Sequence, residues 1–142
     1  MQALTDGVVT IRPPEPGDAG VLAAGHDEEA KRWLGPGGGD VPPTACILVG
    51  GAVVGWIDFD TDRAWLHTGE VNIGYLVFAE HRRQGYAAHA LELFLQYLAS
   101  TEFHTATLLI DPANAASLAV AARGGFELHG EINGERYFKR KV

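Results

Sequence analysis

Residues 71–95, VNIGYLVFAEHRRQGYAAHALELFL, decide the fold class of this chain of 142 residues. An apolar run ends in two arginines, a glutamine and a glycine, and apolar residues at helical spacing begin at once, at Ala87, Leu91, Phe94, Leu95 and Leu98. The pattern predicts a buried central strand over 70–78 that leads directly into a helix over 85–100. Such a junction leaves the first N–H groups of the helix without backbone acceptors, and the helix dipole adds positive potential there.

The side chains at this junction favour an anionic ligand. Arg82 and Arg83 add positive charge and forked hydrogen-bond donors. Gly85 lets a large group approach the backbone closely, and the small side chains of Ala87 and Ala88 keep that approach open. A ligand that carries a pyrophosphate would use all of these groups. The alternative is an ordinary tight turn before a solvated helix, and the residues alone leave both interpretations open.

The overall composition is that of one globular domain. Apolar residues make up 46% and charged residues 20% of the chain, which is enough for a core without disulfides or metal. The single cysteine, Cys46, allows no internal disulfide, so we expect a reducing compartment, the cytoplasm. The net charge of -7 disfavours nucleic acid and anionic lipid as partners. We expect neither a signal peptide nor a membrane span, because no segment has the required apolar length or flanks.

The remaining segments predict a single α/β (α+β) domain over residues 1–142 with a mixed central sheet of about seven strands flanked by about four helices. Strands are expected at 7–12, on either side of Gly50-Gly51, at 70–78, at 106–111 and on either side of Asn133-Gly134. Helices are expected after Asp18, at 28–34, at 85–100 and from Asn114 to Arg123. The order is therefore β-α-α-β-β-β-α-β-α-β-β, and the glycine- and proline-rich residues 35–43 predict a loop.

The junction resembles a known signature. Arg82-x-x-Gly85-x-Ala87 after a strand is similar to the acetyl-CoA signature Q/R-x-x-G-x-G/A of the GNAT superfamily of N-acetyltransferases. Three longer segments resemble the RimJ/RimL-like branch, which includes the ribosomal-protein N-terminal acetyltransferases: GVVTIRPPEPGDA (7–19), NIGYLVFAEHRRQGYAAHAL (72–91) and IDPANAASLAVAARGGF (110–126). The resemblance covers nearly the whole chain and implies a GNAT domain with acetyl-CoA as co-substrate.

The resemblance also implies where coenzyme A binds. Backbone N–H groups over 83–88 would cradle the pyrophosphate, and the backbone over 76–78 would pair with the pantetheine arm like an extra strand. A splayed opening between the strands at 70–78 and 106–111 would admit the arm, and Asn114 would hydrogen-bond it. The coenzyme A residues implied in this way are Leu76, Val77, Phe78, Arg82, Arg83, Gln84, Gly85, Tyr86, Ala87, Ala88 and Asn114.

One catalytic position departs from the family pattern. Many members carry a tyrosine seven residues after the asparagine, as the acid that protonates the leaving thiolate, and this chain has Ala121 there. Ser117 would lie near the thioester sulfur, on the same helical face as Ala121, and is expected to substitute. A thiol with a pKa of about 8.5 leaves readily without a strong acid. The alternative for Ser117 is a surface serine near a helix cap.

The acceptor side needs a group that accepts a proton, because only a neutral amine attacks. Glu70 resembles in position the strand glutamate that serves as base in several members, and Asn72 on the same strand face could orient a water. Asp58, Asp60 and His67 are further candidates, and a solvated carboxylate at a strand start is the alternative for Glu70. The segment between the first two long strands is shorter than in RimJ/RimL-like enzymes, so the acceptor stays open: a protein N-terminus, an aminoglycoside-like or polyamine cation, or an amino-acid-like metabolite.

These observations predict a bacterial, cytoplasmic N-acetyltransferase that works by direct attack in a ternary complex. A covalent acetyl-cysteine is not expected, because Cys46 lies in a predicted strand away from the signature. The alternative function is a non-catalytic acyl-CoA-binding sensor or interaction module. We expect no metal, because His89 and His104 lack partners at metal-ligand spacing. The expected partner is a small-molecule or peptide amine, not nucleic acid or membrane, and a homodimer is left open.

Overall fold

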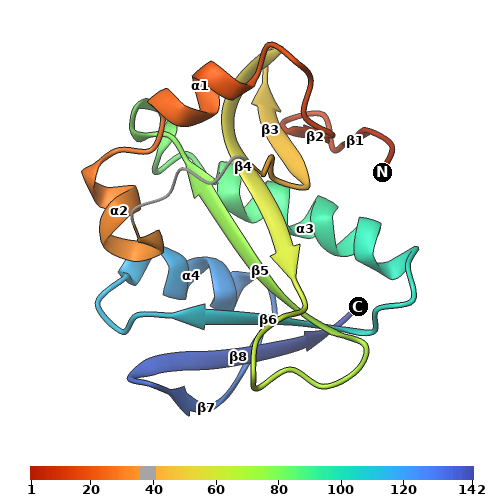
Figure 1. Cartoon of the computed structure of the whole chain (residues 1–142), viewed down its shortest axis with the longest axis vertical. Coiled ribbons are helices and arrows are strands. Elements are labelled where there is room, and N and C mark those ends of the chain that lie inside the picture. Colours follow the sequence, from red (N-terminus) through yellow and green to blue (C-terminus); the bar gives the residue numbers. More distant parts are fainter. Residues whose placement is uncertain (36–40) are drawn as a thin grey trace.

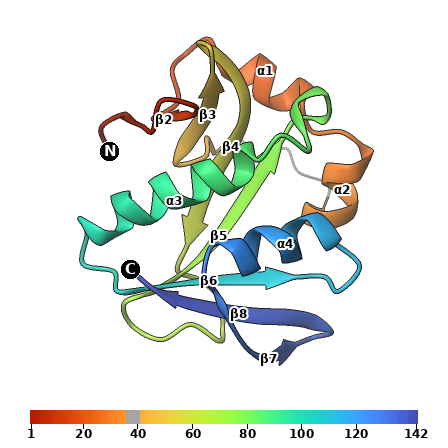
Figure 2. The same ribbon diagram turned by 180° about the vertical axis from the view of Figure 1, so that it is seen from behind.

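An eight-stranded mixed sheet forms the centre of the computed structural model, which describes residues 1–35 and 41–142. In sheet order the strands are β1 (Leu4–Thr5), β2 (Thr10–Arg12), β3 (Ala45–Val49), β4 (Ala52–Asp60), β5 (Glu70–Val77), β6 (Thr105–Ile110), β8 (Glu135–Lys141) and β7 (Glu127–Ile132). The helices are α1 (Ala19–Ala24), α2 (Glu28–Leu34), α3 (Tyr86–Ala99) and α4 (Ala115–Arg123), with a short 3-10 helix η1 (Ala79–His81). Helices α1 and α2 lie on one face of the sheet (Figure 1), and α3 and α4 lie on the other (Figure 2).

The main hydrophobic core lies between the sheet and the helices α3 and α4. The apolar stripe of α3 buries Leu91, Phe94 and Leu98 almost completely against the inward side chains of the strands. A smaller cluster on the opposite face joins Ala30 of α2 to Leu76 and Phe78. Burial of the α3 stripe stabilises the helix far more than its intrinsic propensity does. The buried stripe therefore fixes α3, and with it the N-terminus of the helix, against the sheet.

The predicted order of elements is confirmed, with one additional strand at the beginning. The strand expected at 7–12 starts only at Thr10, and the two residues of β1 pair with β2 ahead of it. Between them Asp6 Oδ1 accepts hydrogen bonds of 2.9 Å from the N–H groups of both Val8 and Val9, which closes a tight turn. The prediction missed β1 because two residues carry no periodicity.

The turns and helix ends follow the sequence signals closely. Both hairpins form, and the residues at their tips have positive φ: 58° and 82° at Gly50-Gly51, 51° and 83° at Asn133-Gly134. Asn114 caps α4 as predicted, because its Oδ1 accepts a hydrogen bond from the N–H of Ser117 at 3.2 Å. The predicted bounds of α2, α3 and α4 agree with the structure to within one residue. The loop predicted over 35–43 falls mostly on residues 36–40, which lie outside the described residues.

The start of α1 is held differently from the expectation. Asp18 occupies the N-cap position, but its carboxylate does not cap the helix. Asp18 Oδ2 instead accepts a 2.7 Å hydrogen bond from the guanidinium of Arg12 and another of 2.7 Å from the N–H of Glu15. The bond from Arg12 keeps the pKa of Asp18 well below its usual range. The ion pair therefore fastens α1 to the sheet through β2.

The strands β5 and β6 pair at one end only. Their parallel register runs from Glu70–Thr105 to Asn72–Thr107, where Thr107 Oγ1 donates a 3.1 Å hydrogen bond to Asn72 Oδ1. Beyond this point β5 stays beside β4, and β6 stays beside β8. Figure 1 shows the two strands diverging toward α2 and α4. The expected opening between these strands is present, and the candidate site lies in it.

Candidate active site

A cleft of about 610 Å³ fills the opening between β5 and β6. Its walls come from α2, the second half of β5, the loop before α3, the first turn of α3, β6 and α4. The coenzyme A residues expected from the sequence that line it are Leu76, Val77, Arg82, Arg83, Gly85, Tyr86, Ala87, Ala88 and Asn114, and Ser117 lines it too. The fold thus brings together four separate parts of the chain around one cavity: 29–34, 73–88, 108–123 and Glu135.

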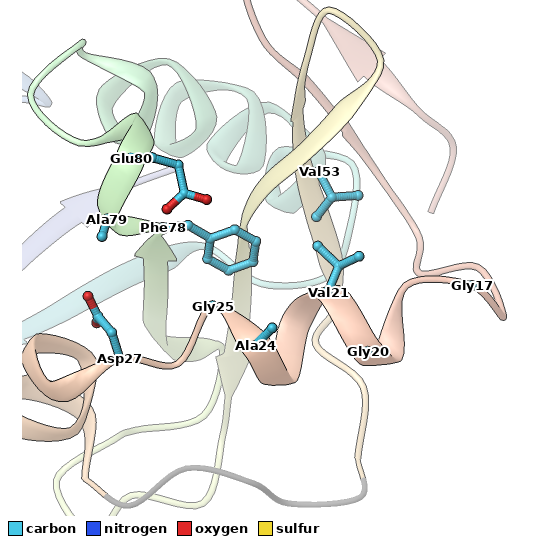
Figure 3. Close-up of a pocket in the computed structure, with 10 residues that line it drawn as sticks. All are labelled: Gly17, Gly20, Val21, Ala24, Gly25, Asp27, Val53, Phe78, Ala79 and Glu80. Atoms are coloured by element: carbon cyan, nitrogen blue, oxygen red, sulfur yellow. The ribbon is translucent and has the colours of Figure 1, made fainter.

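Phe78 and Gln84 are the two expected coenzyme A residues outside the cleft lining. The Phe78 ring lies against α1, where a Cβ on Gly25 would be only 2.3 Å from it, and it borders a separate pocket of about 500 Å³ (Figure 3). The N–H of Phe78 donates to Val54 O at 2.8 Å, so this backbone donor is already used. Gln84 is exposed, and its Oε1 accepts a 3.0 Å hydrogen bond from the hydroxyl of Tyr86.

The N-terminus of α3 is built to receive an anion. Gly85 stands at the N-cap with φ of 81°, a conformation that glycine adopts without strain, and a Cβ there would meet nothing within 4 Å. His89 N–H bonds to Gly85 O at 3.2 Å, so the N–H groups of Tyr86, Ala87 and Ala88 precede that hydrogen bond of the helix. These donors, the dipole of a helix of 14 residues and the open space above Gly85 fit a pyrophosphate.

The two arginines of the signature have different surroundings. Arg82 turns toward α2: its Nη1 and Nη2 contact Asp27 Oδ2 and Oδ1 at 3.0 and 2.9 Å, and Nη1 also contacts Glu29. Its Nε donates to Val77 O at 2.8 Å. Arg83 is exposed, has a φ of 63°, and forms no ion pair with any described residue. Arg83 is therefore the signature cation left free for a ligand, and Arg82 holds the loop to α2.

A pair of hydroxyl groups lines the cleft where β5 faces α4. Tyr75 on β5 donates a 3.0 Å hydrogen bond from its hydroxyl to Ser117 Oγ on α4. Burial raises the pKa of Tyr75 above its ordinary value, and the bond to Ser117 offsets part of that rise. Ala121, which stands where many relatives have a tyrosine, is fully buried in the core. Sequence analysis missed Tyr75, because no local pattern separates it from an ordinary aromatic strand residue.

Glu70 is buried and already paired. Its Oε2 lies 2.9 Å from Lys139 Nζ, and its Oε1 accepts a 3.0 Å hydrogen bond from the N–H of His67. Burial alone would raise the pKa of Glu70, but the bonds from His67 and Lys139 outweigh it and lower the pKa. Its neighbour Asn72 is buried at the point where β5 and β6 diverge. A base role for Glu70 stays a prediction, and its pairing makes it a weaker proton acceptor.

Asp58 is a half-buried carboxylate with a raised pKa, next to a residue of the cleft lining. It lies on β4 opposite Gly74, and a Cβ on Gly74 would be 3.3 Å from Asp58 Oδ1. Gly74 lines the cleft beside the divergence of β5 and β6. Burial and, to a lesser extent, the nearby charge of Asp60 raise the pKa of Asp58 to about 6. Asp60 itself pairs with Arg63 at 3.1 Å, whereas Asp58 has no ion-pair partner in the described part of the chain.

Three further reactive side chains considered in the sequence lie outside the cleft lining. Cys46 is fully buried next to Asp18, and burial raises the pKa of its thiol to about 11. His89 Nδ1 pairs with Asp6 at 2.6 Å, and His104 Nδ1 contacts Thr105 Oγ1 at 2.8 Å. Over residues 1–35 and 41–142, no group of three or more His, Cys, Asp or Glu side chains is arranged to hold a metal ion. The same residues include no helix with the length and apolar character that a membrane crossing requires.

Solved structures with the same fold are numerous, and three illustrate the range. An acetyltransferase from Agrobacterium tumefaciens str. C58 has 21% identity and a TM-score of 0.79, with 99% of this chain and 94% of that chain covered. RimJ from Mycobacterium smegmatis, in complex with CoA-disulfide, has 21% identity and a TM-score of 0.75, with 96% and 83% covered. The aminoglycoside acetyltransferase AAC(6')-Ib, in complex with coenzyme A and kanamycin, has 18% identity and a TM-score of 0.76, with 94% of both chains covered.

These likenesses establish the fold and do not assign the chain to the RimJ/RimL-like branch, since RimJ is one neighbour beside aminoglycoside acetyltransferases. No curated protein sequence matches the chain. A family model does: residues 44–127, more than half of the chain, match the acetyltransferase (GNAT) domain. The matched segment includes β5, the signature loop, α3, β6 and α4, which form most of the cleft, and α2 and Glu135 complete it from outside the segment. The chain therefore belongs to the GNAT acetyltransferase family.

Proposed function

We propose that this chain is an acetyl-CoA-dependent N-acetyltransferase that moves the acetyl group to a primary amine by direct attack in a ternary complex. The observation that carries the proposal is the single cleft that joins the N-terminus of α3 to Asn114 and Ser117 on α4. Its anion-binding end suits the pyrophosphate of acetyl-CoA, and its other end suits the thioester. A fully buried Cys46 with a raised thiol pKa supports direct attack over a covalent acetyl-cysteine.

In this proposal the N–H groups at the start of α3 and the side chain of Arg83 bind the pyrophosphate. The Oδ1 of Asn114 caps α4, which leaves its amide nitrogen to bind the pantetheine arm. Arg123 lines the same cleft from the end of α4 and adds a second exposed cation. Nothing in the sequence singled out Arg123, because basic residues are common in the last turn of a helix.

The chemical step needs a neutral amine and a stabilised leaving thiolate. The amine nitrogen attacks the thioester carbonyl, the C–S bond breaks, and its electron pair stays on sulfur. We assign the amine proton to Asp58 rather than Glu70. A carboxylate with a pKa of about 6 is a better proton acceptor near neutral pH than one whose pKa is lowered by the bonds from His67 and Lys139. In this proposal Asn72, two residues from Gly74 on the same strand face, orients a water that carries this proton.

A small cationic amine is the acceptor that the charges favour. Asp58 lies on the sheet face that α1 and α2 cover only in part, two residues along β4 from Trp56, which packs near α2. Its charge is not balanced by a described ion pair, so a protonated amine is attracted there. A protein N-terminus is the alternative acceptor. We expect the reaction to take place in the bacterial cytoplasm, where acetyl-CoA is available.

Calorimetric titration with acetyl-CoA tests the first half of the proposal. We expect micromolar binding by the native chain and loss of binding in Gly85→Glu, whose side chain would enter the anion site. Release of free thiol in the presence of a panel of polyamines, aminoglycosides, amino-acid amides and peptides with free N-termini tests the second half. Binding without turnover of any amine would favour the alternative, a non-catalytic acyl-CoA-binding module. No binding by the native chain would overturn the proposal altogether.

A further inference from the structure

The hydroxyl pair of Tyr75 and Ser117 reaches across the cleft between two elements that are far apart in sequence. Tyr75 lies in the half of β5 that has parted from β6, and Ser117 lies in the first turn of α4, 42 positions later. Both residues line the cleft, next to Asn114. The pair therefore lies where the resemblance implies the thioester sulfur. The position at which the resemblance implies a tyrosine is Ala121, which has no hydroxyl group.

The direction of the hydrogen bond decides what Ser117 can do. Tyr75 donates its proton to Ser117 Oγ, so the serine oxygen is the acceptor in this pair. A serine on a helix often donates its own proton to the carbonyl one turn earlier. In the described part of the chain, the Ser117 hydroxyl makes no hydrogen bond besides the one from Tyr75. The proton of the Ser117 hydroxyl is therefore not used in the pair and can be donated to a second acceptor.

We propose that Tyr75 is a positioning residue that orients the Ser117 hydroxyl, so that Ser117 donates a hydrogen bond to the thiolate of coenzyme A as the C–S bond breaks. This inference rests on the proposed acetyl transfer and goes beyond it by naming how the missing tyrosine is replaced. A hydroxyl that accepts a hydrogen bond becomes a stronger donor, because the two bonds polarise each other. A bond to an ionised sulfur is of the stronger, charge-assisted type.

The protons balance without any transfer from Tyr75 or Ser117. An alcohol holds its proton far more tightly than a thiol with a pKa of about 8.5. Burial also raises the pKa of Tyr75, so its phenol stays protonated over the working pH range. The thiolate therefore leaves with the electron pair of the C–S bond, is stabilised by the Ser117 O–H, and takes its final proton from solvent. The proton lost by the amine passes to the base.

The test measures the bound thiol and the kinetics together. The thiolate absorbance of coenzyme A bound to the native chain, followed against pH, is expected to give a thiol pKa below that of free coenzyme A. Tyr75→Phe and Ser117→Ala are each expected to raise that bound pKa and to lower kcat about 10- to 100-fold, with the KM for acetyl-CoA unchanged. Ser117→Thr, which keeps a hydroxyl, is expected to restore part of kcat. The double variant is expected to lose no more than Ser117→Ala alone, because the two hydroxyls act as one unit.

Matched controls separate orientation from folding. Tyr97→Phe removes a tyrosine hydroxyl from α3 outside the cleft and should leave both measurements at the native value. Cys46 is silent in the absorbance titration, because burial raises its own pKa to about 11. Thermal melting shows whether each variant is folded. A native thiol pKa and native kcat in folded Tyr75→Phe would overturn the inference and leave the acetyl transfer standing. Failure of the native chain to bind coenzyme A would instead overturn the proposed function and the inference with it.

Discussion

Arg82 and Asp27, 55 positions apart in the chain, form a two-pronged ion pair with contacts of 2.9 and 3.0 Å. Asp27 at the same time caps α2 by accepting a 3.0 Å hydrogen bond from the N–H of Ala30. The hydrogen bonds from Arg82 and Ala30 lower the pKa of Asp27 to about 2. One carboxylate thus joins the start of α2 to the loop before α3, and α2 forms part of the cleft wall.

Arg82→Gln is expected to lower the free energy of unfolding by about 1–3 kcal/mol, because it removes charge-assisted hydrogen bonds from a partly buried Asp27. Arg83→Gln is the matched control at the neighbouring position. It should leave unfolding unchanged within about 0.5 kcal/mol and raise the KM for acetyl-CoA several-fold, since Arg83 is exposed and without an ion-pair partner in the described residues. Urea denaturation and steady-state kinetics measure the two effects. A loss of stability in Arg83→Gln, or a stability in Arg82→Gln equal to that of the native chain, would contradict the roles given to these arginines.

Gly85→Ala and Gly134→Ala are expected to lower stability equally, but only Gly85→Ala is expected to lower the affinity for acetyl-CoA. The two glycines have φ of 81° and 83°, and a Cβ at either would meet nothing within 4 Å. Each substitution should therefore cost about 1–2 kcal/mol of stability, from the left-handed conformation alone. Only Gly85→Ala should also weaken acetyl-CoA binding in calorimetry, since its methyl group enters the anion site. Equal affinities in the two variants would mean that the open space at Gly85 serves no ligand.

Asp58→Asn is expected to lower kcat about 100-fold or more at pH 7.5, because the general base is lost. In the native chain, kcat should fall as the pH drops through about 6, where Asp58 becomes protonated. Asp60→Asn is the control: it lies two residues along the same strand, paired with Arg63, and should keep the native pH profile apart from a small shift. A native profile in Asp58→Asn, with the acidic limb intact, would move the base role elsewhere, with Glu70→Gln as the next variant to measure.

Asp58→Asn, which is expected to lower kcat, should raise the stability of the fold at neutral pH. The pKa of Asp58 is raised in the folded state, so the folded chain holds the proton more tightly than the unfolded chain does. The contribution of Asp58 to stability is therefore greatest below its unfolded pKa of 3.8 and declines as the pH rises through about 6. Asp58→Asn should melt at a higher temperature than the native chain at pH 7.5, and the gain should shrink toward pH 4. A variant that melts lower at pH 7.5 would show that the Asp58 carboxylate is stabilised by its surroundings.

Lys139→Met is expected to destabilise the fold by about 3 kcal/mol at neutral pH, because it leaves the buried carboxylate of Glu70 without its cation. The native pairing lowers the pKa of Glu70, so its contribution is present above the unfolded pKa and is lost as the pH falls. The difference in unfolding free energy between the native chain and Lys139→Met should therefore shrink in acid. A pH-independent difference would trace the loss to packing of the lysine stem.

Most of the fold could be predicted because its signals are local. The Asn133-Gly134 turn requires two positive φ values that these residues tolerate, Asn114 satisfies free N–H groups within one turn, and the α3 stripe repeats at helical spacing. The exception, β1, is only two residues long and forms because the Asp6 turn folds it back onto β2. The backbone geometry of the candidate anion site could be predicted in the same way, since a strand that runs into a helix through Gly85 defines it without distant partners.

The amino-acid sequence by itself determined the elements and their order, because each depends on neighbours within a few residues, and it carries the resemblance to the family. Only the tertiary structure decided which side chains meet. It paired Arg82 with Asp27, Glu70 with Lys139, and Tyr75 with Ser117. Among the described residues it gave neither Arg83 nor Asp58 an ion-pair partner. The three paired contacts join positions 42 to 69 residues apart, and many other charges and hydroxyls in the chain could have formed them. The packing of the helices on a splayed sheet selects among them, and no local pattern encodes that choice.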